Sequence, residues 1–162
     1  NQAMKIGRVT ISDRARAGVY ADRSGPEIER ILREQFGADA QFVAAVVSDE
    51  TELISGKLRE FADDEHCDLI VTTGGTGIGP RDVTPEATRA VLEKELPGFG
   101  ELMRMQSFAR VRTAILSRAV AGTRGRSLIV NLPGSSRGAE ESLDAVLPGL
   151  LHAFKMMRGG GH

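Results

Sequence analysis

The sequence predicts a three-layer, Rossmann-like α/β domain in which a mostly parallel sheet lies between two layers of helices. Short apolar, β-branched segments alternate along the chain with segments whose apolar residues recur at helical spacing. The segment Asp68–Thr73 is continuously apolar, which is typical of a strand covered on both faces. Because the chain has 162 residues, we expect one domain over residues 5–157, with flexible termini at 1–4 and 158–162.

The first half of the chain opens with a β-branched strand over Lys5–Ser12, followed by a polar loop over residues 13–25. A helix follows, with Pro26 in its first turn and Gly37 directly after its end. Its apolar residues fall on one face, at the helical repeat. The next expected elements are a strand over 40–47 and a helix over 50–63.

The second half of the chain follows the same alternation. A glycine-rich loop follows the strand 68–73, and Thr84 is expected to cap the helix after it. The segment 113–125 gives no clear prediction. The last helix carries a long apolar stripe, and Pro148 within it is expected to kink it. The remaining expected elements are a helix over 99–108 and a strand over 127–132.

Composition excludes several classes of protein. Lys and Arg number 21 against 22 Asp and Glu, so the broad basic field of a non-specific nucleic-acid binder is absent. One cysteine and three histidines exclude an internal disulfide and favour no zinc cluster. Cys67 is expected in the core. No apolar run is long enough to span a membrane, and the first residues lack the apolar stretch of a secretory signal. We therefore expect a cytoplasmic protein with no nucleic-acid or membrane partner.

Ligands of parallel α/β sheets bind beyond the carboxyl ends of the strands. Four segments directly follow predicted strands, so they are expected to share one rim of the sheet. Each also has a simpler interpretation as a plain turn, and the residues alone leave both open for Ser12, Asp13 and Asn131. The four segments are Ser12–Arg14, Ser48–Glu50, Gly74–Thr84 and Asn131–Gly134.

The segment Gly74–Asp82, called the glycine loop below, has four glycines in its first six residues. Without Cβ atoms its N–H groups are open to a phosphate or another anion. Pro80 stands where a Walker A loop needs lysine, and also where the dinucleotide motif needs its last glycine. The loop is therefore neither a P-loop nor a nicotinamide-binding turn, and a turn without a ligand remains possible.

Two carboxylates next to predicted strand ends are candidates for chemistry. Asp82, before the helix at Thr84, is suited to hold Mg²⁺ or orient a phosphate, or to bond nearby N–H groups in a turn. Asp49 has an acidic residue three positions on, at Glu52, which is the pattern of a capping box. Capping and metal binding are compatible, because a carboxylate has two oxygens.

The string Gly-Gly-Thr-Gly-x-x-Pro-Arg-Asp-Val-Thr-Pro-Glu-Ala-Thr, which runs from Gly74 to Thr88, closely resembles the molybdenum-cofactor biosynthesis domain family. The similarity covers about residues 5 to 157. Other marks of the family follow in the order in which the family has them. They are Ser12-Asp13, Asp22–Pro26, Asp49-Glu50, Pro97–Glu101, Met103-Arg104, Ala114–Arg118 and Asn131–Gly134.

The resemblance implies a molybdopterin-binding type of fold and a Mg²⁺-dependent transfer of AMP from ATP to the terminal phosphate of molybdopterin, with release of pyrophosphate. It implies that Asp49 and Asp82 are the catalytic pair, which would also hold Mg²⁺. It also implies a homotrimer, and the apolar residues of 99–125 are a separate hint of one, although they would also complete a core. The implied substrate and nucleotide contacts are Ser12, Asp13, Gly74, Gly75, Thr76, Gly77, Ser107, Asn131, Pro133 and Gly134.

Three alternatives stay open at this point. A MoaB-type relative would share these motifs with the same or reduced activity. A non-catalytic molybdopterin-binding scaffold is the second, although it would not require both carboxylates. A general nucleotide phosphotransferase is the third, and the missing Walker lysine counts against it. The sequence also does not decide which arginine would contact phosphate. The candidates are Arg14, Arg81 and Arg137.

Overall fold

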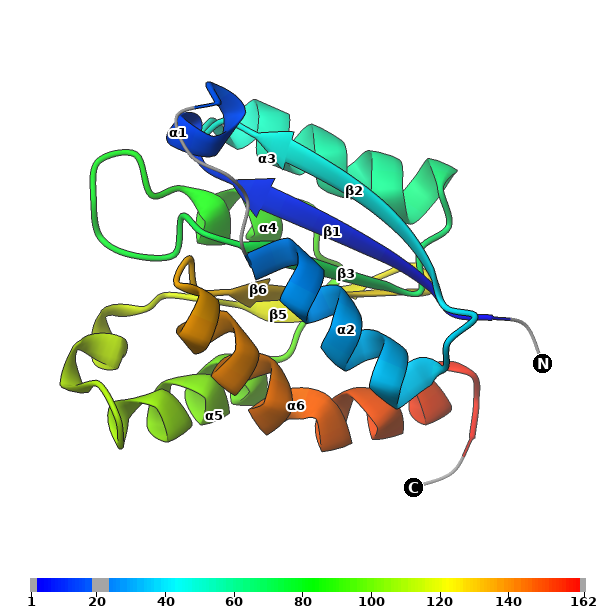
Figure 1. Cartoon of the computed structure of the whole chain (residues 1–162). Coiled ribbons are helices and arrows are strands. Elements are labelled where there is room, and N and C mark those ends of the chain that lie inside the picture. Colours follow the sequence, from blue (N-terminus) through cyan, green and yellow to red (C-terminus); the bar gives the residue numbers. More distant parts are fainter. Residues whose placement is uncertain (1–2, 19–23, 161–162) are drawn as a thin grey trace.

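The computed structural model describes residues 3–18 and 24–160. Its centre is a six-stranded sheet with the order β2-β1-β3-β6-β5-β4 (Figure 1). The strands from β2 to β6 in this order run parallel, and β5 and β4 add an antiparallel edge. The strands are β1 (Lys5–Ile11), β2 (Gln41–Val47), β3 (Leu69–Thr73), β4 (Lys94–Glu95), β5 (Ala121–Arg124) and β6 (Ser127–Leu132).

Helices cover both faces of the sheet, which confirms the predicted three layers. Helices α2, α5 and α6 lie on one face, and α3 and α4 on the other (Figure 1). Each face has its own apolar core, around Leu128 on the first and Ile70 on the second. The helices are α1 (Asp13–Arg16), α2 (Ser24–Phe36), α3 (Thr51–Arg59), α4 (Thr84–Arg89), α5 (Pro97–Phe108) and α6 (Ser136–Met157). A π-helical turn, η1 (Glu60–Asp64), extends α3, and a 3-10 helix, η2 (Arg112–Leu116), follows α5.

The expected elements are present, and two further short elements, α1 and β4, were not predicted. The polar loop after β1 begins with the short helix α1, whose N-cap Ser12 accepts a hydrogen bond from the amide of Ala15. The segment without a clear prediction forms η2 and β5. Helix α6 continues through Pro148, as its apolar stripe predicts, and the kink at Pro148 stays a prediction.

Some predictions cannot be followed into the structure. The family mark at Asp22–Pro26 falls partly on residues 19–23, outside the described residues, as do the terminal residues 1–2 and 161–162. Cys67 is buried, as predicted. Within the described residues, no helix has the length and apolar character needed to cross a membrane.

Both predicted helix caps were wrong. The N-cap of α3 is Glu50, and no side chain caps that helix. Asp49 bonds elsewhere, because its Oδ2 accepts a hydrogen bond from the amide of Asp13 at 2.9 Å. The N-cap of α4 is Val83, and the hydroxyl of Thr84 donates to the carbonyl of Gly74 at 2.9 Å. In both cases a long-range partner has taken the side chain that the local pattern assigned to a cap.

Candidate active site

The four predicted segments do meet at one rim of the sheet. Each follows a parallel strand at its carboxyl end: α1 follows β1, the turn before α3 follows β2, the glycine loop follows β3, and the turn before α6 follows β6. Figure 1 shows the glycine loop extending from the same end of the sheet as α1. The amide of Gly74 donates to the carbonyl of Leu132 at 3.2 Å, which joins the last two segments.

Close backbone packing requires glycine at the start of the glycine loop. Gly74 has φ +97°, and a Cβ there would lie 2.3 Å from the carbonyl oxygen of Ile11. Gly75 has φ +70°, and a Cβ there would lie 2.2 Å from Oγ1 of Thr84. A side chain at either position would therefore meet both a strained backbone conformation and a clash. These two glycines bring the loop against β1 and α4.

Asp82 closes the far end of the loop. Its Oδ2 accepts a hydrogen bond from the amide of Gly79 at 2.9 Å, and its own amide donates to the carbonyl of Gly79 at 3.0 Å. A Cβ at Gly77 or Gly79 would lie 2.9 Å from that same carboxylate oxygen. The turn interpretation of Asp82 is thus correct, and the turn also places the carboxylate against the glycines of the loop.

Asp13 and Asp49 hold each other by reciprocal hydrogen bonds. The amide of Asp13 donates to Oδ2 of Asp49 at 2.9 Å, and the amide of Asp49 donates to Oδ1 of Asp13 at 3.0 Å. Arg81, in the glycine loop, reaches across with a two-pronged pair to the Asp13 carboxylate, both contacts at 3.0 Å. The ends of β1 and β2 and the glycine loop are therefore joined through one aspartate. We call Asp13, Asp49, Arg81 and Asp82 the carboxylate cluster.

Within the carboxylate cluster, Arg81 pairs with Asp13, and Asp49 has no ion-pair partner in the cluster. The Arg81 guanidinium holds the pKa of Asp13 below its usual range. The pKa of Asp49 is raised, chiefly by burial and further by the charges of Asp13 and Asp82, against the lowering effect of hydrogen bonding to Asp13. A cation placed beside Asp49 would therefore stabilise its ionised form.

This donor set fits Mg²⁺, which takes oxygen ligands and keeps several of its waters. Among the described residues no three His, Cys, Asp or Glu side chains are arranged to enclose a metal by themselves. An ion held by Asp49 and Asp82 would thus complete its coordination with water and with phosphate oxygens of a ligand. The protein would supply only part of the coordination shell.

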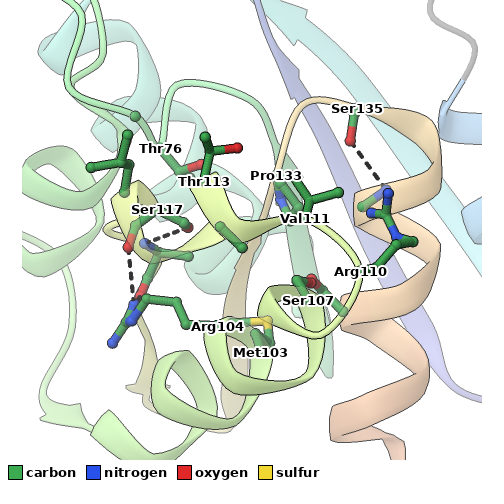
Figure 2. A pocket seen from close by; sticks show the side chains of 16 residues that line it. Thr76, Met103, Arg104, Ser107, Arg110, Val111, Thr113, Ser117, Pro133 and Ser135 are labelled. Carbon is green, nitrogen blue, oxygen red and sulfur yellow. Dashed lines mark hydrogen bonds between the residues drawn. The ribbon is translucent and has the colours of Figure 1, made fainter.

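On the other side of the glycine loop lies a pocket of about 300 Å³, between the loop and the α5–η2 segment (Figure 2). Its walls combine apolar side chains such as Met103 and Val111 with hydroxyl groups such as Ser107. Of the predicted contacts, four line it: Thr76, Gly77, Ser107 and Pro133. The full lining is Thr76, Gly77, Met103, Arg104, Ser107, Arg110, Val111, Thr113, Ala114, Leu116, Ser117, Ala119, Pro133, Ser135, Gly138 and Ser142.

Ser107 is the polar group of the pocket whose bonding is incomplete. Its side chain is 8% exposed. Its hydroxyl makes no hydrogen bond of good geometry within the described residues, although it lies near the Glu141 carboxylate. Among the described residues, Glu141 Oε1 is the other buried oxygen without a partner of good geometry. Hydrogen bonding to Arg110 and then to Ser107 lowers the pKa of Glu141, so Ser107 and Glu141 lie against each other beside the pocket. Ser107 faces the pocket in Figure 2.

Asn131 has a different place from the one expected. Its side chain is fully buried, and its amide nitrogen donates to the hydroxyls of Thr72 and Thr88, each at 3.0 Å. Its Oδ1 accepts from the amide of Val120 at 3.2 Å. These bonds tie β6 to β3, α4 and the residue before β5, so the side chain holds these elements together and does not reach the rim. Gly134 does reach it, where a Cβ would lie 3.4 Å from Cα of Gly74.

Of the three arginines considered for phosphate, Arg14 is exposed on α1, and Arg81 lies in the carboxylate cluster and is paired with Asp13. Arg137 lies on the outer face between α5 and α6, next to Glu141, and does not line the pocket. The arginine that sequence reasoning missed is Arg118, whose guanidinium bonds the carbonyls of Gly77 and Asp82. The only sequence signal for it was its place in the Ala114–Arg118 family mark.

Comparison with known proteins gives one consistent answer. The chain matches the family described as "Probable molybdopterin binding domain" over residues 7–152. It is 49% identical to the curated molybdopterin adenylyltransferase of Helicobacter pylori strain J99 over 98% of this chain and 90% of that protein. It is 46% identical to the one from Escherichia coli K12, over 88% and 73%. The solved structure of the molybdopterin biosynthesis enzyme MoaB from Thermus thermophilus matches with a TM-score of 0.86 and 47% identity, over 96% of this chain and 97% of that one.

Proposed function

The chain belongs to this family of molybdopterin binding domains, and on that premise we propose that it is a molybdopterin adenylyltransferase of molybdenum cofactor biosynthesis. The observation that carries the proposal is the near-full-length identity with curated enzymes of that name, 49% over 98% of this chain. The geometry of the rim supports it, because carboxylates, a glycine loop and a ligand-sized pocket adjoin one another.

The reaction transfers AMP from ATP to the terminal phosphate of molybdopterin. An oxygen of that phosphate forms a bond to the α-phosphorus of ATP, the bond between the α-phosphorus and its bridging oxygen to the β-phosphorus breaks, and pyrophosphate leaves. The attacking phosphate is already ionised near neutral pH, so the protein needs no strong base. Its task is to bring two anions together and to stabilise the charge that grows on pyrophosphate.

The carboxylate cluster and the glycine loop suit this task. Asp49 and Asp82 would hold Mg²⁺, which when bound neutralises phosphate charge and favours departure of pyrophosphate. The backbone N–H groups of the glycine loop would donate to phosphate oxygens. Asp13 would act mainly on Asp49, whose carboxylate it fixes through its own amide. The terminal phosphate and the triphosphate would therefore meet at the loop.

The pocket supports binding of the pterin part of molybdopterin. A pterin is flat, with apolar faces and a hydrogen-bonding edge. Met103, Val111 and Leu116 supply apolar walls, and the Ser107 hydroxyl supplies a buried polar contact. The volume of about 300 Å³ is at the small end for a ligand site. Thr76 and Gly77 belong to the glycine loop and also line the pocket. A pterin bound in the pocket would therefore have its phosphate next to the loop.

We propose in addition a homotrimer, as the resemblance to the family implies, in the cytoplasm. Of the apolar residues of 99–125, Met103 belongs to the buried core and Phe99 packs against it. A further set of apolar residues between Leu102 and Leu116 is exposed, and a subunit contact would cover those that do not line the pocket. These exposed residues are Leu102, Met105, Phe108, Val111, Ile115 and Leu116.

All rim segments come from one chain, so each subunit would hold a complete site. Light scattering during size exclusion tests the assembly, and the mass of a single chain at micromolar concentration would contradict it. One nucleotide bound per three chains would contradict the independence of the sites.

A MoaB-type role is the second candidate, because a structure of that name is 47% identical to this chain. One assay separates the candidates. The protein is incubated with molybdopterin and Mg-ATP labelled at the α-phosphate, and the products are separated. We expect label in molybdopterin and an equal amount of pyrophosphate. Molybdopterin binding without transfer would refute the proposal and favour a MoaB-type or scaffold role.

A further inference from the structure

Arg118, which the proposed reaction does not use, holds the glycine loop from behind. Its Nε donates to the carbonyl of Gly77 at 2.8 Å, and its Nη2 donates to the carbonyl of Asp82 at 2.9 Å. Its own backbone amide donates to the carbonyl of Thr76 at 2.8 Å. Three hydrogen bonds from one residue therefore hold both ends of the turn that closes the loop.

The third arm of the guanidinium is also engaged. Nη1 pairs with the carboxylate of Glu86 on α4, and this pairing holds the pKa of Glu86 below its usual range. Each of the three guanidinium nitrogens thus has an acceptor. A planar, forked donor suits this arrangement, and an ammonium group would not reach all three acceptors. Arg118 is arranged as a clamp on protein groups, and a phosphate would have to displace them to bind it.

Fixing the loop carbonyls also fixes the groups that face a ligand. In a trans peptide the C=O and the following N–H point in opposite directions. By holding the carbonyl of Gly77, Arg118 therefore sets the direction of the Ile78 N–H group. By holding the carbonyl of Asp82, it sets the direction of the Val83 N–H group in the same way. A loop with this many glycines has wide conformational freedom of its own. The clamp removes part of that freedom before any ligand binds.

The segment that carries Arg118 is itself held in place by α5. Nη1 of Arg104 donates to the carbonyls on either side of Arg118, those of Ser117 at 3.3 Å and Ala119 at 3.2 Å. Figure 2 shows Arg104 reaching Ser117 at the edge of the pocket. Gly100 lets α5 approach, because a Cβ there would lie 2.6 Å from the carbonyl oxygen of Ala119. The glycine loop is thus connected to a pocket wall through two arginines.

We propose that Arg118 is a positioning residue for adenylyl transfer, which holds the glycine loop and the Asp82 backbone in the arrangement that the reaction needs. The inference rests on the proposed function for the reaction that it affects. A displacement of about 1 Å at a reacting centre can cost about 10²-fold in rate. We therefore expect Arg118→Ala to lower kcat about 10²-fold, with a smaller change in the KM for molybdopterin, whose pocket has most of its lining elsewhere.

The test compares Arg118→Ala and Arg118→Lys with Arg89→Ala as the matched control. Arg89 is on α4, it pairs with Glu95, and its charge affects the pKa of Glu86 less than that of Arg118 does. Steady-state kinetics with molybdopterin and Mg-ATP gives kcat and KM. Amide hydrogen exchange on the ligand-free proteins, with residues 74–83 as the reporting peptide, gives a readout that needs no activity. Thermal unfolding shows that the variants fold.

We expect faster exchange confined to residues 74–83 in Arg118→Ala, partial recovery of kcat in Arg118→Lys, and wild-type behaviour of Arg89→Ala. Wild-type exchange and kcat in Arg118→Ala would overturn the inference. Faster exchange across the whole chain would also overturn it, since the role would then be general stability. If the wild-type protein transfers no AMP, the proposed function fails, and the exchange of residues 74–83 still decides whether Arg118 holds the loop.

Discussion

The two sides of the glycine loop are built by opposite means. In the carboxylate cluster, charged groups hold one another through short hydrogen bonds, such as the reciprocal pair of Asp13 and Asp49. In the pocket, apolar walls surround about 300 Å³ of space, and the Ser107 hydroxyl lacks a well-formed hydrogen bond within the described part of the chain. One side is organised before any ligand arrives, and the other keeps its room and a poorly bonded hydroxyl for a ligand.

This difference matches two separate tasks. Charge that develops during phosphoryl transfer is stabilised best by groups already fixed in place, because they need no reorganisation during the reaction. Binding of a flat, partly apolar group depends on shape and on apolar surface removed from water. Substitutions on the first side should therefore change kcat, and substitutions on the second should change KM. The glycine loop, which borders both, should affect stability as well.

The largest expected effect is that of Asp49→Asn. The loss of a carboxylate that holds the metal should lower adenylyl transfer about 10²-fold or more. Because burial raises the pKa of Asp49, its ionised form opposes folding above that pKa, so the variant should not be less stable at pH 7. Kinetics and thermal unfolding check both statements. Asp64→Asn, exposed at the opposite end of the sheet, is the control, and wild-type turnover by Asp49→Asn would contradict the assignment.

The second largest expected effect is a loss of stability in Gly75→Ala. In Gly75→Ala, the φ of +70° and the Cβ contact at 2.2 Å from Thr84 Oγ1 should cost about 1–3 kcal/mol of unfolding free energy. Urea unfolding measures this cost. Gly56→Ala is the matched control, because Gly56 lies within α3 and a Cβ there meets nothing within 4 Å. That variant should gain about 0.5–1 kcal/mol. Equal stability of the two variants would show that the loop tolerates a side chain.

A smaller effect is expected from Ser107→Ala in the pocket, and it should appear in KM, whereas Asp49→Asn changes kcat. The KM for molybdopterin should rise about tenfold, the value of one hydrogen bond to a ligand, with kcat nearly unchanged. Stability should change by no more than about 1 kcal/mol, because the hydroxyl lies against the Glu141 carboxylate without a hydrogen bond of good geometry. Kinetics with varied molybdopterin, together with thermal unfolding, tests this. A fall in kcat at constant KM would place Ser107 with the reacting groups.

The smallest expected effect is a shift in the pH dependence of kcat/KM in Arg81→Ala. Arg81 lowers the pKa of Asp13 most and that of Asp49 to a lesser extent. Its removal in Arg81→Ala raises both pKa values, so the acidic limb of the profile of kcat/KM against pH should move to higher pH. Above that limb the loss should stay within about fivefold, because the pair is exposed. A limb that moves to lower pH would contradict the electrostatic account of the cluster, and Arg89→Ala should leave the profile unchanged.

The linkage of the Arg81–Asp13 pair to stability has a defined sign. The folded pKa of Asp13 is lowered, so the contribution of the pair is present above the ordinary pKa of an aspartate and is lost as pH falls through the folded value. The difference in unfolding temperature between the wild type and Arg81→Ala should therefore disappear under acid conditions. A difference that grows as pH falls would contradict this interpretation.

The parallel part of the fold could be predicted because its signals are local. Apolar strands such as β3 and the helical stripe of α2 each appear within a dozen residues, and the rim follows from strand direction. The edge strand β4 could not be predicted, because its two residues, Lys94 and Glu95, are exposed and charged and pair only through the return of β5. Its pairing depends on tertiary structure alone.

A site residue such as Gly74 could be predicted because the loop backbone and the expected function require the same residue there. Residues whose role is set by hydrogen bonds to distant parts of the chain could not be predicted. Asp49 fits a local cap, and its bond to Asp13 appears only when β1 and β2 lie side by side. Asn131 fits a ligand contact and instead ties several elements together. Arg118 is 41 residues from the carbonyl of Gly77 that it holds. Pairings at such separations leave no pattern in one sequence.

The most direct test of this division is to measure molybdopterin binding and AMP transfer separately in Asp82→Asn and Ser107→Ala. Calorimetric titration with molybdopterin gives Kd, and a single-turnover assay at saturating molybdopterin and Mg-ATP gives the transfer rate. We predict a crossover: Asp82→Asn keeps the wild-type Kd and loses about 10²-fold or more in transfer, while Ser107→Ala loses affinity and keeps the rate. Loss of molybdopterin binding in Asp82→Asn, or wild-type transfer by it, would contradict the account.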